Sequence, residues 1–367
     1  MNYIEVIKTA LFAFPIVAFI FTIPFILIEY HRYGSINKLR TFIVYSFILY
    51  LITIYFLVIL PLPEISEVEE MTSPYFNLIP FSFVKDIIDK SSFVLTNPHT
   101  YLKSLANPCI YVAVFNIFMT MPFGMYLRYY YKCSFKKTVF FTFLLSLFFE
   151  LTQLSGLYFI YPRPYRLFDV DDLLLNTLGG GIGYLIMGLF LNHLPSRDKI
   201  DEKSKQVGER VSGLRRITLY LLDTFIYMFL LILINLFIKN SYTKYILFIL
   251  YFVIIPYFMD CSTLGGKFLN VKLNFPDKKI LRLFLRALIT YFNYFGLVYF
   301  VALGLFKLNN YSYFNTVEKL CLFGVVFIGL FLFYIINIFT ILFKSKAHYD
   351  KYTGVLFKST INKDKQI

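Results

Sequence analysis

The stretch FFTFLLSLFFELTQLSGLYF (residues 140–159) decides the fold of this chain. It is long enough to cross the hydrocarbon core of a bilayer, which takes about 20 mainly apolar residues. Glu150 is the only charged residue within it. Because a backbone that crosses lipid must satisfy its hydrogen bonds internally, this stretch predicts a transmembrane helix.

The same kind of apolar segment recurs along the whole chain. Hydrophobic residues make up 58% of the 367 residues and charged residues only 16%, whereas a soluble domain has about 25% charged residues. We therefore predict an all-α, polytopic membrane helix bundle with about nine transmembrane helices, five before a polar boundary and four after it. The predicted spans are residues 7–29, 41–60, 108–127, 138–159, 172–192, 217–238, 245–259, 287–306 and 319–343.

The charged loops between these spans predict how the chain is threaded through the membrane. Basic loops at 31–40, 128–137, 195–216 and 260–286 alternate with acidic or nearly neutral loops such as 61–105. By the positive-inside rule, the N-terminus should lie outside and the C-terminus inside. We attribute the net charge of +14 to this topology and to anionic lipid headgroups, and not to nucleic acid. The expected location is the bacterial plasma membrane.

A polar stretch, PSRDKIDEKSKQVGERVSG (195–213), divides the chain in two. We expect it to be a cytosolic linker because it is the longest strongly polar segment. The predicted domains are then a membrane domain at 1–194, a second membrane domain at 214–356 and a cytosolic tail at 357–367. No internal repeat relates the two halves, so an inverted-repeat transporter is not indicated.

Polar side chains lie well inside the fourth predicted span and also follow it on the outer side, where the fifth span begins. Glu150 and Gln153 are three residues apart and so share one helix face. The segment RLFDVDDLLLNTLGGGIGY (166–184) follows, with an arginine, three aspartates and an asparagine. An ionisable residue within a membrane is costly and marks a candidate functional site. The candidate binding residues are Asn116, Glu150, Gln153, Arg166, Asp169, Asp171, Asp172 and Asn176.

Two interpretations of this polar cluster are open. In the first, Glu150 bonds Asn176 or Arg166 and only fixes the packing of the helices. In the second, the cluster lines one pocket at the outer leaflet, where the arginine would suit a phosphate and the carboxylates a divalent cation or an ammonium group. The cluster has no histidine and no pair of nucleophile and base, so we assign no catalytic residue and, that divalent cation aside, no cofactor.

Three further features of the sequence concern packing and metal binding. The segment SPYFNLIPFSFVKDIIDKSSFVL (73–95) is too short and too polar to span, so we expect either an amphipathic lid over the pocket or a loosely packed loop. Gly179 and Gly183 form a small-xxx-small pair, which predicts close helix packing. The wide spacing of the cysteines predicts neither a metal site nor a disulfide framework. They are Cys109, Cys133, Cys261 and Cys321.

Residues from about 75 to 190 resemble the VanZ-like family. The resemblance rests on NLIPF (77–81), Asn116, PFG (122–124), Glu150 with Gln153, and the ordered run Arg166, Asp169, Asp172, Asn176 and Gly179. It implies a link to the cell envelope and to tolerance of glycopeptide or lipoglycopeptide antibiotics of the teicoplanin type. A biochemical mechanism does not follow from the resemblance.

Charged residues in the second half predict a structural network on the inner side of the membrane. Asp223 lies seven residues after Arg216, which is two helical turns, and is expected to be buried. A buried carboxylate needs a cation, and Arg282 and Arg286 are the expected partners. Asp350 is expected on the same side, at the end of the last span.

This second half resembles the RDD family over about residues 214–356. The matched residues are Arg216, Asp223 and Asp350, with TLGGKFLNVKL (263–273) and HYDKYTGV (348–355). The chain departs from the family pattern at Gly266, where a lysine is usual, and at Tyr349, which separates His348 from Asp350. Some relatives are linked to cation/proton exchange, and TLGGK is also compatible with an anion-binding turn.

Three functional hypotheses from different classes follow. The first is a binding or shielding protein whose pocket engages a lipid headgroup, a lipid-linked cell-wall precursor or the tail of a lipoglycopeptide. The second is an enzyme that modifies a phospholipid or polyprenyl phosphate, with Glu150 or Asp172 as acid and base. The third is a transporter of cations, protons or small solutes, with Glu150 and Asp223 as relay carboxylates. Membrane lipids are the expected partners, and the sequence does not predict an oligomeric state.

Overall fold

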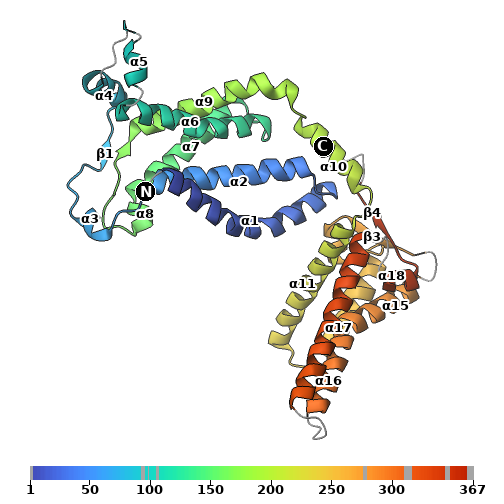
Figure 1. The fold of residues 1–367 in the computed structure, drawn as a ribbon. Helices are drawn as coiled ribbons and strands as arrows, with labels where there is room; N and C mark the ends of the chain where they lie inside the picture. The colour runs from blue at the N-terminus through green and yellow to red at the C-terminus, as the bar shows by residue number, and fades with distance from the viewer. Residues whose placement is uncertain are drawn as a thin grey trace. The chain divides into compact units, whose positions relative to one another are not determined.

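The computed structural model describes residues 3–91, 96–97, 99–104, 107–275, 279–309, 316–343 and 348–361. Within these residues the chain is mostly helical (Figure 1), and seven helices are long and apolar enough to cross a membrane. Two shorter apolar helices, Thr243–Phe258 and Leu297–Lys307, overlap the seventh and eighth predicted spans. The prediction of an all-α, polytopic membrane bundle is therefore confirmed.

The chain divides into two compact units, which we describe separately. Unit 1 comprises residues 1–22 and 38–200, and unit 2 comprises residues 23–37 and 201–367. Helix α1 (Tyr3–Tyr33) therefore contributes its first part to unit 1 and its last part to unit 2. Much of the expected linker forms helix α10 (Arg197–Gly208).

Unit 1 is built on helices α6 (Pro108–Tyr129), α7 (Phe135–Leu154) and α9 (Val170–Phe190), which pack against one another. The contact between α6 and α9 is the most extensive. A Cβ atom on Gly179 would collide with the carbonyl oxygen of Ile117, and one on Gly183 with that of Met121. The predicted close packing through these small residues is therefore confirmed.

Shorter elements surround these three helices. Helix α2 (Lys38–Ile59) packs against α7. Strand β1 (Phe76–Asn77) runs parallel to β2 (Phe168–Asp169), which ties the NLIPF segment to the residues just before α9. The remaining elements are α3 (Ile65–Glu69), α4 (Ser82–Lys90), α5 (His99–Ser104), α8 (Gly156–Phe159) and η1 (Leu191–His193).

The fourth predicted span, 138–159, ends too late. Helix α7 stops at Leu154, and Gly156 follows with a φ of +60°, a left-handed conformation that glycine adopts at little cost. The chain then turns into the separate helix α8. As a result, Glu150 and Gln153 lie in the last two turns of α7, and not well inside a span as the sequence had indicated.

Unit 2 is organised around helix α11 (Gly213–Phe237), which contacts α17 (Thr316–Phe343), α12 (Thr243–Ile249) and α14 (Leu264–Phe268). Its largest buried cluster includes Tyr227, Phe248, Tyr251 and Leu283. The strands β3 (Val271–Asn274) and β4 (Leu356–Ser359) pair antiparallel. The other elements are η2 (Leu250–Ile254), α13 (Ile255–Phe258), α15 (Lys279–Tyr291), η3 (Phe292–Gly296), α16 (Leu297–Asn309) and α18 (His348–Thr353).

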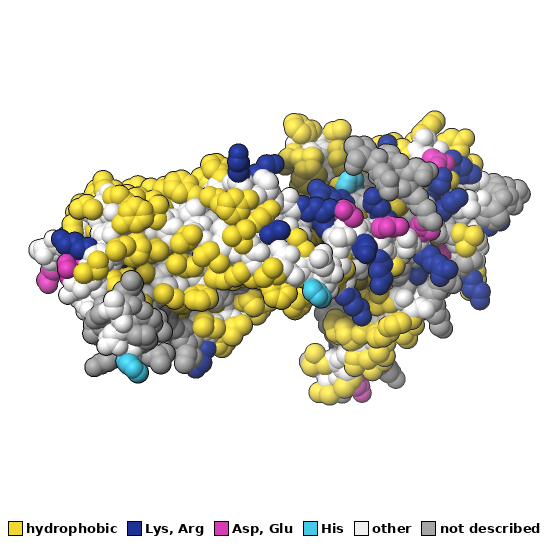
Figure 2. All heavy atoms as spheres, turned by 90° about the horizontal axis from the view of Figure 1, so that it is seen from above, with side chains coloured by type: hydrophobic (Ala, Val, Ile, Leu, Met, Phe, Trp, Pro, Cys, Tyr) yellow, Lys and Arg dark blue, Asp and Glu magenta, His cyan; other side chains and the backbone are white. Residues whose placement is uncertain are grey.

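The outer faces of the long helices remain apolar. Figure 2 shows hydrophobic side chains in yellow over large parts of the surface, with Lys and Arg gathered in other regions. Phe12 and Phe19 of α1 are 84% and 73% exposed, and Phe237 of α11 is 86% exposed. Exposed apolar surface on this scale is expected where helices contact lipid tails.

Candidate functional site

A polar pocket with a volume of about 380 Å³ lies between the helices of unit 1. It is formed by α6, α7, α9, the end of α2, the start of α1 and the segment before α9. Six of the eight candidate binding residues line it. They are Asn116, Glu150, Gln153, Arg166, Asp172 and Asn176.

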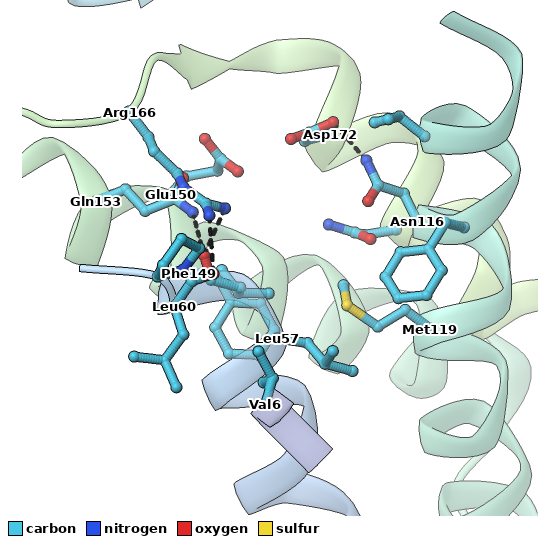
Figure 3. Close-up of a pocket in the computed structure, with 15 residues that line it drawn as sticks. Val6, Leu57, Leu60, Asn116, Met119, Phe149, Glu150, Gln153, Arg166 and Asp172 are labelled. Atoms are coloured by element: carbon cyan, nitrogen blue, oxygen red, sulfur yellow. Dashed lines mark hydrogen bonds between the residues drawn. The ribbon is translucent and has the colours of Figure 1, made fainter. Parts of the chain in front are cut away.

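Figure 3 shows how the polar and apolar parts of this pocket are arranged. Glu150, Gln153 and Arg166 lie together on one side, and Asn116 and Asp172 lie on the other. Apolar side chains form the lower wall in this view. They include Val6, Leu57, Met119 and Phe149. The pocket therefore offers polar groups next to an apolar wall, as ligand sites commonly do.

Helix α7 presents one polar face to the inside of unit 1. Thr138, Thr142, Ser146 and Glu150 follow one another at intervals of four residues, and all are buried. Side chains four residues apart lie one above the other on a helix. This periodicity directs Glu150 toward the pocket, although the sequence analysis used only Glu150 and Gln153 from this face.

The contacts of Glu150 differ from both bonds that the packing interpretation predicted. Its Oε2 atom accepts a hydrogen bond from the backbone N–H of Asp169 at 2.9 Å. Neither Asn176 nor Arg166 donates to it. Asn176 donates instead through Nδ2 to Oγ of Ser146 at 2.9 Å. Ser146 lies one turn before Glu150 on the same face of α7, so it also faces α9. The sequence analysis did not identify this serine as part of the cluster.

Arg166 connects the pocket to the end of α2. Its Nη1 atom donates to the carbonyl of Val58 at 2.8 Å, and its Nη2 atom donates to that of Leu60 at 2.9 Å. Gln153 also donates to the carbonyl of Val58, at 2.9 Å (Figure 3). The last carbonyls of a helix have no partner within the helix, so these side chains satisfy groups that would otherwise be unpaired.

Asp172 and Asn116 join α9 to α6 across the pocket. Nδ2 of Asn116 donates to Oδ1 of Asp172 at 2.5 Å. Thr120, one turn further along α6, donates to the backbone carbonyl of Asn176 at 2.7 Å. These bonds fix the register of the two helices and hold Asp172 at the pocket.

The other two aspartates, Asp169 and Asp171, do not line the pocket. The side chain of Asp169 caps α9 by accepting from the backbone N–H of Asp171, and it also accepts from Nδ2 of Asn77. Asp171 is 2% exposed and accepts from the backbone N–H groups of Phe81 and Phe83 and from Oγ of Ser82, at 2.6, 2.9 and 2.7 Å. Both carboxylates therefore hold the NLIPF segment and the start of α4.

Residues 73–91, the described part of the segment 73–95, match neither alternative from the sequence. No described residue of α4 lines the pocket, so the helix is not a lid over it. The described part is not loosely packed either, because β1 pairs with β2 and Asp171 binds the turn before α4. Ile88 and Ile79 nevertheless remain 70% exposed on this segment.

In unit 2, the hydrogen bonds to Asp223 come from neutral groups, and Arg286, one of its two predicted partners, adds an electrostatic interaction. Its carboxylate accepts from the hydroxyls of Tyr251 at 2.8 Å and Thr263 at 2.7 Å, and from the backbone N–H of Gly265 at 3.1 Å. Three neutral donors can satisfy a buried carboxylate without an arginine. Two residues of the TLGGK turn, Thr263 and Gly265, thus donate hydrogen bonds to a carboxylate of the same chain, that of Asp223.

The charged residues expected around Asp223 have other contacts. Arg286 forms a buried ion pair with Asp350, with 3.1 Å between Nε and Oδ1. Arg282 donates to the carbonyl of Thr353, and Arg216 donates to that of Ile341. These residues thus tie the helices of unit 2 to its C-terminal segment.

Arg215 is a structural residue that sequence analysis missed. It is fully buried and donates to the backbone carbonyls of Gly208, Leu269 and Asn270. It thereby joins the end of α10 to the loop after α14. Two adjacent arginines, Arg215 and Arg216, precede an apolar span in the sequence, and this pattern indicates charged groups at a helix start. The sequence analysis assigned a structural role only to Arg216.

Metal binding has no direct support among the residues that the structure describes. No group of three or more His, Cys, Asp or Glu residues there is arranged to hold a metal ion. The pocket itself contains two carboxylates, Glu150 and Asp172. The four cysteines are free thiols. A divalent cation at the acidic cluster stays an untested prediction.

Comparison with protein families identifies the part of the chain that contains the pocket. Residues 47–191 match the family model described as VanZ/LLP1. This range includes α6, α7 and α9 and all six candidate residues that line the pocket. Comparisons with curated proteins and with solved structures gave no match. Residues 47–191 are therefore similar to the VanZ/LLP1 family, and the RDD resemblance of residues 214–356 stays a prediction.

Proposed function

We propose that the VanZ-like part of this membrane protein binds the headgroup of a membrane lipid, or of a lipid-linked cell-wall precursor, at the outer leaflet. The observation that carries this proposal is the polar pocket of unit 1, which lies among helices with apolar outer faces. A lipid held in the bilayer could place its polar headgroup against Glu150, Arg166 and Asp172. The adjoining apolar wall would accommodate the first carbons of the tail.

The consequence of this binding would be lower susceptibility to teicoplanin-type glycopeptides and lipoglycopeptides. The family resemblance supplies the link to these drugs. A protein that holds a precursor, or the lipid tail of such a drug, changes how much of the drug's target is accessible at the membrane surface. This role requires only binding, for which the pocket has suitable polar groups.

The experiment is a measurement of drug susceptibility in a strain that lacks this gene. The strain would be complemented with the wild type, Glu150→Gln, Arg166→Ala or the control Glu67→Gln, whose carboxylate is exposed on α3. We expect the wild type and the control to restore protection against teicoplanin, and the two pocket variants to fail at equal protein levels in the membrane. Equal protection by all four proteins would contradict the proposal.

The enzyme and transporter hypotheses have less support. None of the described residues that line the pocket is Ser, Thr, Cys, His or Lys, so an enzyme would depend on Glu150 or Asp172 alone. Asp223, the proposed inner relay carboxylate, is bound by three donors within unit 2. A change in lipid composition on deletion, reversed by the wild type and not by Glu150→Gln, would favour the enzyme.

A further inference from the structure

The side-chain amides of the unit 1 pocket use their N–H donors on neighbouring groups. Nδ2 of Asn116 donates to Asp172, Nε2 of Gln153 to the carbonyl of Val58, and Nδ2 of Asn176 to Oγ of Ser146. Both terminal nitrogens of Arg166 donate to backbone carbonyls. Five of the eleven polar hydrogens on these four side chains are thus directed toward the protein itself.

The orientation of the Asn176 amide follows from its neighbour. Oγ of Ser146 donates its single hydrogen to the backbone carbonyl of Asp172 at 3.3 Å. It can therefore only accept from Asn176, which places Nδ2 toward the serine and leaves Oδ1 on the other side. Asn176 is 4% exposed, and no described residue donates to this oxygen.

Two carboxylate oxygens of the pocket also have no donor in the described part of the chain, but unlike Oδ1 of Asn176 they are not fully enclosed by the protein. Among the described residues, no donor reaches Oε1 of Glu150 or Oδ2 of Asp172, because their single hydrogen bonds are made by the other carboxylate oxygens. A buried acceptor without a donor costs free energy, and two carboxylates face one guanidinium across the same space. Among the described lining residues, carboxylates therefore outnumber cations by two to one.

We propose that the unit 1 pocket binds a primary ammonium group, as in the headgroup of an ethanolamine lipid. The inference rests on the proposed function and specifies the part of the headgroup that is recognised. An ammonium supplies N–H donors and one positive charge, which suit the free carboxylate oxygens of Glu150 and Asp172. The volume of about 380 Å³ leaves room for the rest of a headgroup beside it.

A phosphate fits the same pocket less well. It would bring further acceptors and negative charge to a site where both are already in excess. The arginine that suits a phosphate is Arg166, and each of its two terminal nitrogens already donates one hydrogen bond to a carbonyl at the end of α2. We therefore expect selection for the amine of a zwitterionic lipid and not for its phosphate.

The test is native mass spectrometry of the full chain in detergent with added lipids of identical acyl chains. The probes are phosphatidylethanolamine, phosphatidylcholine, whose quaternary ammonium is positively charged but has no N–H group, and phosphatidylglycerol, which has no amine. We expect phosphatidylethanolamine to be retained about tenfold more tightly than the other two. Glu150→Gln and Asp172→Asn should each weaken its retention by about tenfold, and the control Glu67→Gln should not.

The two substitutions keep the shape of the side chain and the acceptor atoms that bond Asp169 and Asn116, so the fold should be retained. An unchanged melting temperature would verify this. If phosphatidylglycerol is retained as tightly as phosphatidylethanolamine, and through the same two residues, the ammonium inference is overturned. The proposal of a headgroup site would still be supported. If no lipid depends on Glu150 or Asp172, the headgroup site itself fails, and the inference fails with it.

Free ethanolamine distinguishes two sources of the ammonium. If it displaces phosphatidylethanolamine from the wild type and not from the Glu150→Gln protein, the amine alone carries the binding, and a soluble amine is a sufficient ligand. If only the intact lipid binds through Glu150, the headgroup is recognised together with its membrane anchor. Either result supports recognition of the ammonium group.

Discussion

Asp171 and Asp172 are adjacent in the sequence and have different roles. Successive residues on a helix point about 100° apart, so Asp172 reaches the pocket while Asp171 reaches the turn before α4. The sequence identifies both as carboxylates of one polar cluster at the start of the fifth predicted span. It does not give the rotation of α9 relative to its neighbours, which depends on the glycine contacts with α6. Residue type therefore predicted the cluster but not the direction of each side chain.

Asp171 should hold the turn that precedes α4. Phe81 adopts a φ of +64° in that turn, a conformation that bulky side chains rarely adopt, and Asp171 binds its N–H. Replacing Asp171 with alanine leaves three donors without their acceptor, at about 1–3 kcal/mol each. We expect faster amide hydrogen exchange in residues 81–90 and little change in α7. Exchange as slow as in the wild type would show that Asp171 does not hold this turn.

The ion pair between Arg286 and Asp350 should be a major source of stability in unit 2. Asp350→Ala leaves the guanidinium buried without this partner, which costs about 3–5 kcal/mol when buried pairs are broken. Thermal unfolding of the purified protein would measure the loss as a lower melting temperature. Asp198→Ala breaks the exposed pair with Lys132 and should have little effect. Similar effects of the two substitutions would contradict this assignment.

At the scale of the helix, the packing of α6 on α9 depends on glycines. Gly183→Ala places a methyl group against the carbonyl oxygen of Met121, and the helices must separate to admit it. Overpacking of this kind costs about 1–3 kcal/mol. We expect a lower melting temperature in detergent and reduced lipid retention by the pocket.

Gly324→Ala is the matched control for this prediction. Gly324 also lies within a long apolar helix, α17, and a Cβ atom there would meet nothing within 4 Å. Alanine favours the helix more than glycine does, so the control should keep or slightly raise stability. If both variants unfold at the same temperature, close packing at Gly183 does not stabilise unit 1.

Helices were predictable from the sequence because length and apolar composition alone determine a span. All nine predicted spans overlap helical segments, although only seven described helices are long and apolar enough to cross a membrane, and some span ends are misplaced, as at Leu154. The sequence also shows the polar face of α7 as polar residues repeated every four positions. The sequence analysis included only Glu150, at the end of this face, in the predicted site. The tight turn at Gly156 and the helix in the polar stretch 195–213 were not predicted, because they depend on local backbone conformation.

At the scale of the whole molecule, the grouping of segments was the least predictable feature. The last part of α1 belongs to unit 2, where Tyr30 is buried with Leu219, Leu269 and Val271. These residues are about 190 or more positions away in the sequence, and a hydrophobic pattern does not specify its partner. The hydrogen-bond partners of Asp223 were missed for the same reason, since Tyr251 and Thr263 meet it only in the folded unit.

The threading of the chain remains a prediction that cysteine labelling can test. In a variant without native cysteines, Ser66→Cys in the acidic loop 61–105 should react with a membrane-impermeant maleimide in intact cells. Lys203→Cys on α10 should react only after permeabilisation, because it lies in a basic loop. The opposite pattern would reverse the topology and place the pocket at the inner leaflet.

The central claim, that the unit 1 pocket binds a lipid headgroup, is tested most directly by photo-crosslinking in cells. The photoreactive residue p-benzoylphenylalanine would replace Phe115 at the pocket wall or, as a control, the exposed Phe229 on α11. We predict that lipid adducts at position 115 are enriched in one amine-bearing headgroup relative to position 229, and that Glu150→Gln removes the enrichment. Adducts of the same composition at both positions would contradict the claim.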